Sequence, residues 1–195
     1  SAFALTEPGA GSDAAAIKTH AELSPDGSHY LINGSKIWIT NGGFADVFTV
    51  FARTSPDEEG RKPKITAFLV ERGPGVTSGP NEPKLGIRGS STTELFFEDV
   101  KVPRDNVIGE VGKGFKVAME VLNNGRLGLA VGCVGLGAAL VKMAIERVQE
   151  RRAFGRHIGD FGMIKDKIAT MLAQLYALES MTYLTAAMVD AKTDY

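Results

Sequence analysis

The pattern of the 195-residue chain changes once, near Pro103, and this change constrains the fold more than any other feature. Before it, short β-prone runs alternate with turn residues, which predicts a small antiparallel barrel or sandwich. After it, apolar residues recur at helical spacing and predict two long antiparallel helices. The expected fold is α+β: an antiparallel, barrel-like β domain over residues 1–113, then two helices of a helical bundle over residues 114–195.

Local signals refine this expectation. Strands are predicted at 28–32, 36–40, 47–53, 64–71 and 92–97, and a tight hairpin turn is predicted at Asn33-Gly34. The charged stretch 55–63, which contains two prolines, is predicted to be a solvated loop. Asn123-Asn124-Gly125 is expected to weaken or bend the first helix. Glycines 128, 132, 135 and 137 form a stripe that another backbone can approach closely, and the broad apolar faces predict that missing sequence or a second subunit completes the bundle.

Composition narrows the function classes. The 22 basic and 23 acidic residues nearly cancel, which argues against nucleic acid or a membrane surface as a partner. No uninterrupted apolar stretch of bilayer-spanning length and no targeting leader is expected, so the chain is predicted to be soluble. Cys133 is a single cysteine and the three histidines are far apart, so neither a disulfide nor a metal site is predicted.

Two segments indicate a phosphate-bearing aromatic cofactor. Residues 6–13, Thr-Glu-Pro-Gly-Ala-Gly-Ser-Asp, combine hydroxyls with glycines that expose peptide amides. Trp38 precedes Thr40 by two residues, so both side chains leave a strand on one face, where an indole can cover a planar ring and a hydroxyl can bond its edge. A flavin nucleotide is the predicted ligand.

These segments have three other interpretations. The fingerprint G-x-G-x-x-A at residues 9–14 is rejected as a Rossmann site, because Pro8 precedes the glycines and the polar stretch that follows leaves no room for a long helix. Asp13 acting as a simple helix cap, and Trp38 acting as an ordinary core residue, both stay open.

The segments Ala4–Asp13 and Trp38–Gly43 resemble the flavin-binding signatures of acyl-CoA dehydrogenases. The resemblance covers essentially the whole chain and implies that residues 1–113 are the middle β domain with its flavin-binding loops, and that residues 114–195 are the first part of the C-terminal helical domain. Segments 84–88, 97–103, 114–119 and 151–155 agree with the family in order and spacing, and segments 122–126 and 179–183 are most similar to its very-long-chain branch.

The resemblance implies FAD as cofactor and assigns its contacts. Phe3, Leu5 and Thr6 would line the flavin ring, Trp38 would cover it, and Thr40 would bond its N5. Gly11 and Ile39 belong to the same two signatures, and Ser12 would lie near the pyrophosphate and the acyl-CoA. Arg151 and Phe154 would reach the pyrophosphate and adenine of FAD in a neighbouring subunit, against the alternative of a solvated Arg and a helix-end Phe. Asn123, Gly125 and Arg126 would border the substrate.

The implied reaction is α,β-dehydrogenation of long-chain acyl-CoA to trans-2-enoyl-CoA in fatty acid β-oxidation. Electron-transferring flavoprotein would be the acceptor, and the enzyme would be a homodimer or homotetramer in the mitochondrial matrix or bacterial cytoplasm. No catalytic residue is assigned: the family's glutamate base is expected beyond Tyr195, and Gly125 occupies the place of the minority alternative, so the chain is expected to be an internal fragment. An acyl-CoA oxidase and a non-catalytic assembly factor of the same fold stay open.

Overall fold

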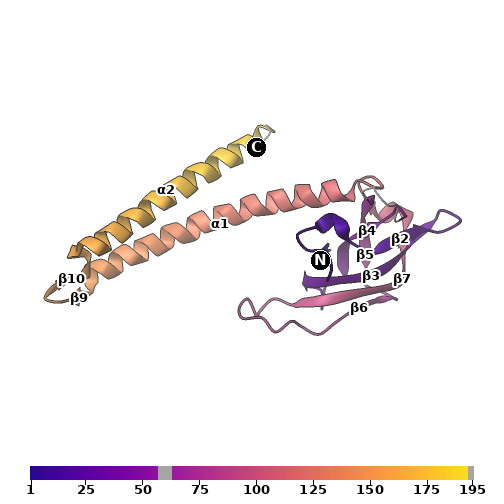
Figure 1. Ribbon diagram of the computed structural model, residues 1–195, viewed down its shortest axis with the longest axis horizontal. Helices are drawn as coiled ribbons and strands as arrows, with labels where there is room; N and C mark the ends of the chain where they lie inside the picture. Colours follow the sequence, from indigo (N-terminus) through magenta and orange to yellow (C-terminus); the bar gives the residue numbers. More distant parts are fainter. Residues whose placement is uncertain (57–62, 193–195) are drawn as a thin grey trace. The chain divides into compact units, whose positions relative to one another are not determined.

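The structure, a computed structural model, describes residues 1–56 and 63–192 (Figure 1). Most of the predicted loop 55–63 therefore lies outside the described residues. The chain divides into two compact units, Ser1–Glu120 (unit 1) and Val121–Tyr195 (unit 2). The predicted domain boundary after residue 113 stays a prediction.

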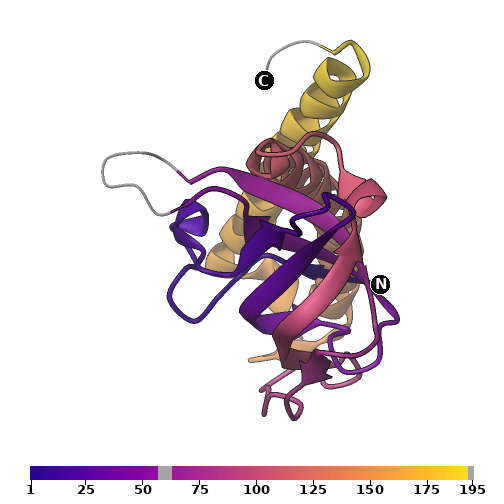
Figure 2. The same ribbon diagram turned by 90° about the vertical axis from the view of Figure 1, so that its right-hand side faces the viewer.

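Unit 1 is built on a twisted sheet in which the described strands lie in the order β6-β7-β3-β2-β4-β5-β8, with β1 beside β4 (Figure 2). Most neighbours are antiparallel, whereas β1 and β2 both run parallel to β4. Among the described residues, β6 and β8 end the sheet and do not pair with each other, so the sheet is open and the expected barrel holds only loosely. The strands are β1 Ala2–Ala4, β2 His20–Leu23, β3 His29–Thr40, β4 Val47–Arg53, β5 Ile65–Glu71, β6 Val76–Ser78, β7 Thr92–Pro103 and β8 Val107–Ile108.

The strands form where apolar residues alternate or run continuously between turn residues. β4 has the predicted bounds and pairs along its whole length with β5, from Val47 opposite Glu71 to Arg53 opposite Ile65. Phe48 and Val50 of β4 and Phe68 of β5 are fully buried in the core of unit 1. Two short 3-10 helices, η1 Ala14–Ala16 and η2 Arg104–Asn106, link strands of this unit.

The predicted hairpin turn at Asn33-Gly34 is wrong. β3 continues through it from His29 to Thr40 and pairs with β7 on both sides of a register shift. Gly34 has a φ of 146°, and a Cβ there would lie 2.5 Å from the Thr19 hydroxyl oxygen. The Asn33 side chain accepts a hydrogen bond from the Asp99 amide at 2.8 Å. Close packing against Thr19 and pairing with β7 thus turn a local hairpin signal into a bulge.

Unit 2 consists of two long helices, as predicted. α1 (Gly114–Glu150) begins in unit 1 and runs unbroken through the Asn-Asn-Gly segment, and α2 (Gly162–Asp190) returns alongside it (Figure 1). The helices are antiparallel, because residues 123–130 of α1 share a hollow with 178–185 of α2, and 145–149 share one with 164–172. The hairpin of β9 (Arg152–Ala153) and β10 (Arg156–His157) and the 3-10 helix η3 (Ile158–Asp160) connect them.

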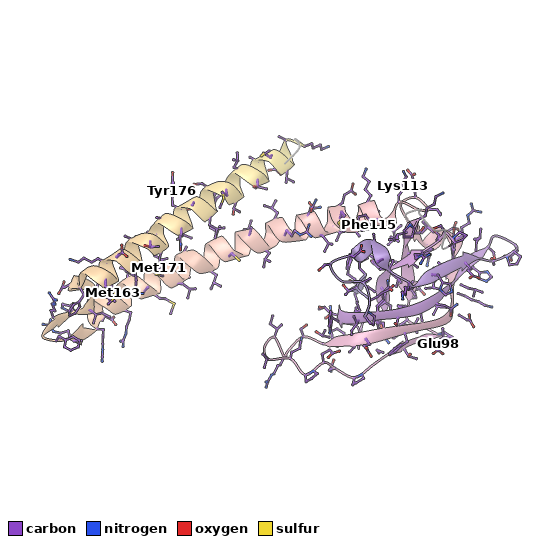
Figure 3. All side chains as sticks on the ribbon, in the orientation of Figure 1. Glu98, Lys113, Phe115, Met163, Met171 and Tyr176 are labelled. Atoms are coloured by element: carbon purple, nitrogen blue, oxygen red, sulfur yellow. The ribbon has the colours of Figure 1, made fainter. Side chains whose placement is uncertain are left out.

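Few side chains of these helices are buried. Thr182 is the buried residue of α2 within the part of the chain that the structure describes, and side chains such as Met163 and Tyr176 project freely (Figure 3). A Cβ at Gly125, Gly128, Gly132 or Gly135 would meet nothing within 4 Å, whereas Gly137 faces Leu175. The apolar faces therefore have few partners in the described chain.

The expectation that no uninterrupted apolar stretch reaches bilayer-spanning length needs qualification, because Arg126 and Lys142 bound the apolar run of α1 but leave it strongly apolar. An 18-residue window of α1 has a mean hydropathy of 1.9, and 6% of that window is buried. By length and composition alone α1 is apolar enough to cross a membrane. A core helix inside a soluble bundle has the same composition, because it too is apolar on all sides.

Candidate cofactor-binding site

The structure brings the two predicted cofactor segments side by side. The amide of Ile37 in β3 donates to the carbonyl of Thr6 at 2.9 Å, and the Asn41 side chain donates to the Ser1 carbonyl at 3.3 Å. Phe3 packs on Phe51 with ring centroids 5.0 Å apart. The N-terminal segment thus lies along the strand that carries Trp38 and Thr40, although about 30 residues separate them in the sequence.

A buried ion pair holds this segment in place. Lys36 Nζ lies 2.8 Å from Glu7 Oε1 and donates to the Leu5 carbonyl at 3.1 Å, and Lys36 and Glu7 are 0% and 6% exposed. The Glu7 carboxylate also accepts hydrogen bonds from the amides of Lys18 and Thr19. Sequence analysis missed this role of Lys36, because its partner lies 29 residues away and nothing local marks the pair.

The ion pair shifts the pKa of both groups. Burial lowers the pKa of Lys36 to about 8, and the negative charge of Glu7 opposes this only in part. For Glu7, burial raises the pKa, but the charge of Lys36 and the hydrogen bonds from Lys18, Thr19 and Lys36 together outweigh it, so the pKa lies below its ordinary 4.5. Glu7 is therefore a structural carboxylate that is ionised at neutral pH.

Trp38 stands at a bulge in β3. The register with β7 shifts between Lys36 and Ile39, and Trp38 has a φ of 58°, which is strained for a bulky residue. Its side chain is 62% exposed and Thr40 is also exposed, whereas Ile39 between them is 2% exposed. Trp38 and Thr40 thus share the solvent side of the strand, and the alternative that Trp38 is a core residue is wrong.

The loop before η1 offers unused hydrogen-bond donors. Glu7 and Ala10 exchange two backbone hydrogen bonds of 3.1 and 3.0 Å, which close a tight turn over Pro8-Gly9. Within the described residues, the amides of Gly11, Ser12 and Asp13 donate no hydrogen bond, and the Thr6, Ser12 and Thr40 hydroxyls bond no side chain or backbone group. The Asp13 side chain makes no cap hydrogen bond to η1, which removes the capping alternative. Successive free amides suit an anion such as a phosphate.

Arg72, which the sequence analysis did not single out, fixes the turn after Thr40. It donates from Nη2 to the Gly42 carbonyl at 2.6 Å and from Nε to the Ala45 carbonyl at 2.7 Å. Its guanidinium also lies 5.0 Å from the centre of the Phe48 ring. A single Arg at the end of a strand carries no sequence signal of such a role.

The remaining predicted site residues belong to unit 2. Arg126 donates to the Asn123 side chain at 2.7 Å, and both line a hollow of about 420 Å³ with residues of α2 such as Leu178 and Met181. Gly125 is exposed on α1 and does not line this hollow.

Phe154 lies at the tip of the β9–β10 hairpin and Arg151 lies at its base, and both are exposed. The structure therefore groups the predicted residues within each unit. Among the described residues, no group of three or more His, Cys, Asp or Glu is arranged to hold a metal ion.

Comparisons with known proteins give a consistent picture. Two family models match, the acyl-CoA dehydrogenase middle domain over residues 2–100 and the acyl-CoA dehydrogenase C-terminal domain over residues 112–194. The human mitochondrial very long-chain specific acyl-CoA dehydrogenase is 51% identical over 199 residues, which cover 100% of this chain and 30% of that protein. The chain thus spans about 30% of the length of this curated relative.

Solved structures of acyl-CoA dehydrogenases are similar to this chain in fold as well as in sequence. Butyryl-CoA dehydrogenase from Megasphaera elsdenii matches with a TM-score of 0.89 and 45% identity, over 100% of this chain and 50% of that chain. An acyl-CoA dehydrogenase complexed with FAD from Bacillus anthracis matches with a TM-score of 0.86 and 43% identity, over 97% of this chain and 32% of that chain.

Replacing Lys36 is expected to destabilise unit 1. Lys36→Met leaves the Glu7 carboxylate buried without a counter-charge, so the free energy of unfolding should fall by about 3 kcal/mol. Urea titration followed by the fluorescence of Trp38, the one tryptophan in the sequence, measures this. The double variant Glu7→Gln/Lys36→Met is the control and should recover at least half of the loss. A single variant within about 1 kcal/mol of the wild type would contradict the assigned role.

Acid should remove the contribution of Glu7. Because its pKa is lower in the folded state than the ordinary 4.5, its stabilising contribution is complete above pH 4.5 and is lost as the pH falls through the folded-state value. Below pH 4.5 the free energy of unfolding of the wild type should therefore fall more steeply than that of Glu7→Gln/Lys36→Met. Parallel curves from neutral to acid pH would count against the ion pair.

Truncating Trp38 and truncating Ile39 are expected to affect the free energy of unfolding very differently. Trp38→Ala should change the free energy of unfolding by less than about 0.5 kcal/mol, because the indole is exposed. Ile39→Ala should lower it by about 2–5 kcal/mol, because it empties a core position. Urea titration followed by far-UV circular dichroism compares the two, and an equal loss in both variants would return Trp38 to a structural role.

Proposed function

The chain belongs to the acyl-CoA dehydrogenase family, and from this membership we propose that it binds FAD and takes part in the α,β-dehydrogenation of acyl-CoA thioesters to trans-2-enoyl-CoA. The observation that carries the proposal is the exposed pair Trp38 and Thr40 next to a loop with three unused backbone amides. No other part of the described unit 1 combines an exposed indole, free hydroxyls and free amides.

The residues present suit the cofactor. Trp38 offers an aromatic surface for the flavin ring, and the Thr6 and Thr40 hydroxyls offer hydrogen bonds to its edge. The amides of Gly11, Ser12 and Asp13 offer donors to the pyrophosphate, and Phe3, Leu5 and Ile39 are assigned by the family resemblance to the lining of the flavin site. FAD, when bound, supplies the acceptor for the hydride that leaves the substrate's β-carbon.

The second half of the cofactor is assigned to the hairpin of unit 2. Arg151 is exposed and its side chain has no partner among the described residues, which suits a diphosphate, and Phe154 offers a ring for adenine. Following the family resemblance, we assign both to the FAD of a neighbouring subunit. The active protein is then a homodimer or homotetramer.

Substrate contacts are assigned to Ser12 in unit 1 and to Asn123, Gly125 and Arg126 of α1. The hollow beside Asn123 and Arg126 supports the assignment, whereas Gly125 rests on its place in the sequence alone. The 51% identity to a very long-chain specific relative favours long acyl chains. Electron-transferring flavoprotein is the proposed electron acceptor, and the mitochondrial and bacterial relatives suit a matrix or cytoplasmic enzyme.

No carboxylate of this chain is proposed as the catalytic base. Glu7 is committed to Lys36 and to two backbone amides, so it is unsuited to accept a proton from the substrate. The base is assigned to the part of the protein outside this chain, since the chain spans 30% of its curated relative.

Two alternatives make different predictions for the whole protein. An acyl-CoA oxidase would reoxidise its substrate-reduced flavin rapidly in air, whereas the proposed dehydrogenase should do so slowly and should reduce electron-transferring flavoprotein. A non-catalytic assembly factor would hold less than one FAD per chain after purification.

Trp38 is expected to contribute to FAD affinity rather than to folding. Titration of the apoprotein with FAD should show about tenfold weaker binding for Trp38→Ala, within the 1–3 kcal/mol range of aromatic stacking. Phe96→Ala is the matched control, because Phe96 is a partly exposed aromatic residue on β7, and it should bind FAD like the wild type. Unchanged affinity in Trp38→Ala would remove Trp38 from the site.

A further inference from the structure

The tip of the β9–β10 hairpin places a bulky aromatic residue in a left-handed backbone conformation. Phe154 and Gly155 have φ values of 54° and 79°, as the two central residues of a type I′ turn require. Asn, Asp or Gly normally occupies the first of these positions, and a bulky residue there is a genuine outlier. The Phe154 side chain is also 94% exposed, so its burial does not offset the strain. An exposed aromatic residue in a strained turn indicates a functional constraint.

Arg152 holds this turn closed. Its Nη2 donates to the Gly155 carbonyl at 3.1 Å, and its Nη1 lies 3.0 Å from His157 Nε2. Because a guanidinium has only donors, His157 Nε2 is the acceptor in this contact, and His157 Nδ1 is buried without a hydrogen-bond partner among the described residues. Arg152 lies on β9 and is paired with His157 on β10. Its guanidinium thus bonds both the Gly155 carbonyl in the turn and a side chain of the opposite strand.

The neighbouring arginines have different surroundings. The Arg151 side chain has no hydrogen bond, ion pair or ring contact among the described residues. The Arg156 guanidinium lies 4.0 Å from the centre of the Phe161 ring, and the centres of the Phe161 and Phe154 rings lie 6.2 Å apart in an edge-to-face arrangement. Within the part of the chain that the structure describes, Arg152 is the one of these three arginines whose side chain bonds the turn itself.

We propose that Arg152 is a positioning residue whose guanidinium fork, supported by His157, fixes the Phe154 turn so that the Phe154 ring is presented to its ligand. The identity of that ligand as the adenine of FAD rests on the proposed function, whereas the clamp on the turn does not. Arg152 acts through geometry rather than charge, because both of its bonds are made within the hairpin.

FAD titration of the apoprotein tests the clamp through its ligand. Arg152→Ala and Arg152→Lys should both weaken FAD binding by about fivefold, because a lysine keeps the charge but lacks the fork. In a Phe154→Ala background, Arg152→Ala should cause no further loss, whereas Arg151→Ala, the matched control, should still weaken binding. Wild-type affinity in Arg152→Lys, or a full additional loss in the Phe154→Ala background, would overturn the positioning role.

Hydrogen exchange of the apoprotein tests the clamp without FAD. The Ile158 amide, which donates to the Arg151 carbonyl at 2.8 Å across the base of the hairpin, should exchange faster in Arg152→Ala, while amides in the middle of α1 and α2 keep their rates. Unchanged exchange at Ile158 would overturn the proposal. Faster exchange at Ile158 together with unchanged FAD affinity in Phe154→Ala would support the clamp and instead refute the assignment of Phe154 to FAD.

Discussion

The buried pair of Lys36 and Glu7 is the interaction on which the candidate site depends. It joins the middle of β3 to the N-terminal segment, and the same lysine bonds the Leu5 carbonyl. Without it, the N-terminal segment would still be held by the pairing of β1 with β4 and by the Ile37–Thr6 and Asn41–Ser1 hydrogen bonds, but the loop that offers free amides would lose its charged anchor to β3. Desolvating two charges is costly, so the pair contributes more to the position of this loop than to the overall stability of the sheet.

Backbone strain occurs at two of the residues that are assigned to ligands, and also at positions without such an assignment, such as Ile87 and Asp99. Trp38 and Phe154 both have positive φ values, and both expose most of an aromatic ring. Each is held by its surroundings: Trp38 by the bulge between β3 and β7, and Phe154 by the Arg152 fork. In both places a strained backbone conformation exposes an aromatic side chain that would be more stable in a core, which is typical of functional positions.

How much was predictable depended on the range of the interactions. The α+β class, β4 and the two helices follow from local apolar patterns, and the exposed face shared by Trp38 and Thr40 follows from strand alternation. The hairpin prediction at Asn33-Gly34 failed because contacts with Thr19 and β7, which are distant in sequence, override the local turn propensity. Lys36, Arg72 and Arg152 were missed because their roles depend on partners that only the folded chain supplies, and the individual flavin contacts came from resemblance to a family rather than from pattern.

The open sheet has a consequence for how the two units behave in isolation. Its edge strands in the described chain are β1, β6 and β8, which are three, three and two residues long, so a foreign strand would find few backbone groups with which to pair. Aggregation through sheet edges is thus disfavoured in unit 1. The surface most prone to aggregation lies on the helices, because α1 exposes a long apolar stretch. Fragments that end before α1 should therefore be better behaved in expression and concentration than fragments that contain it.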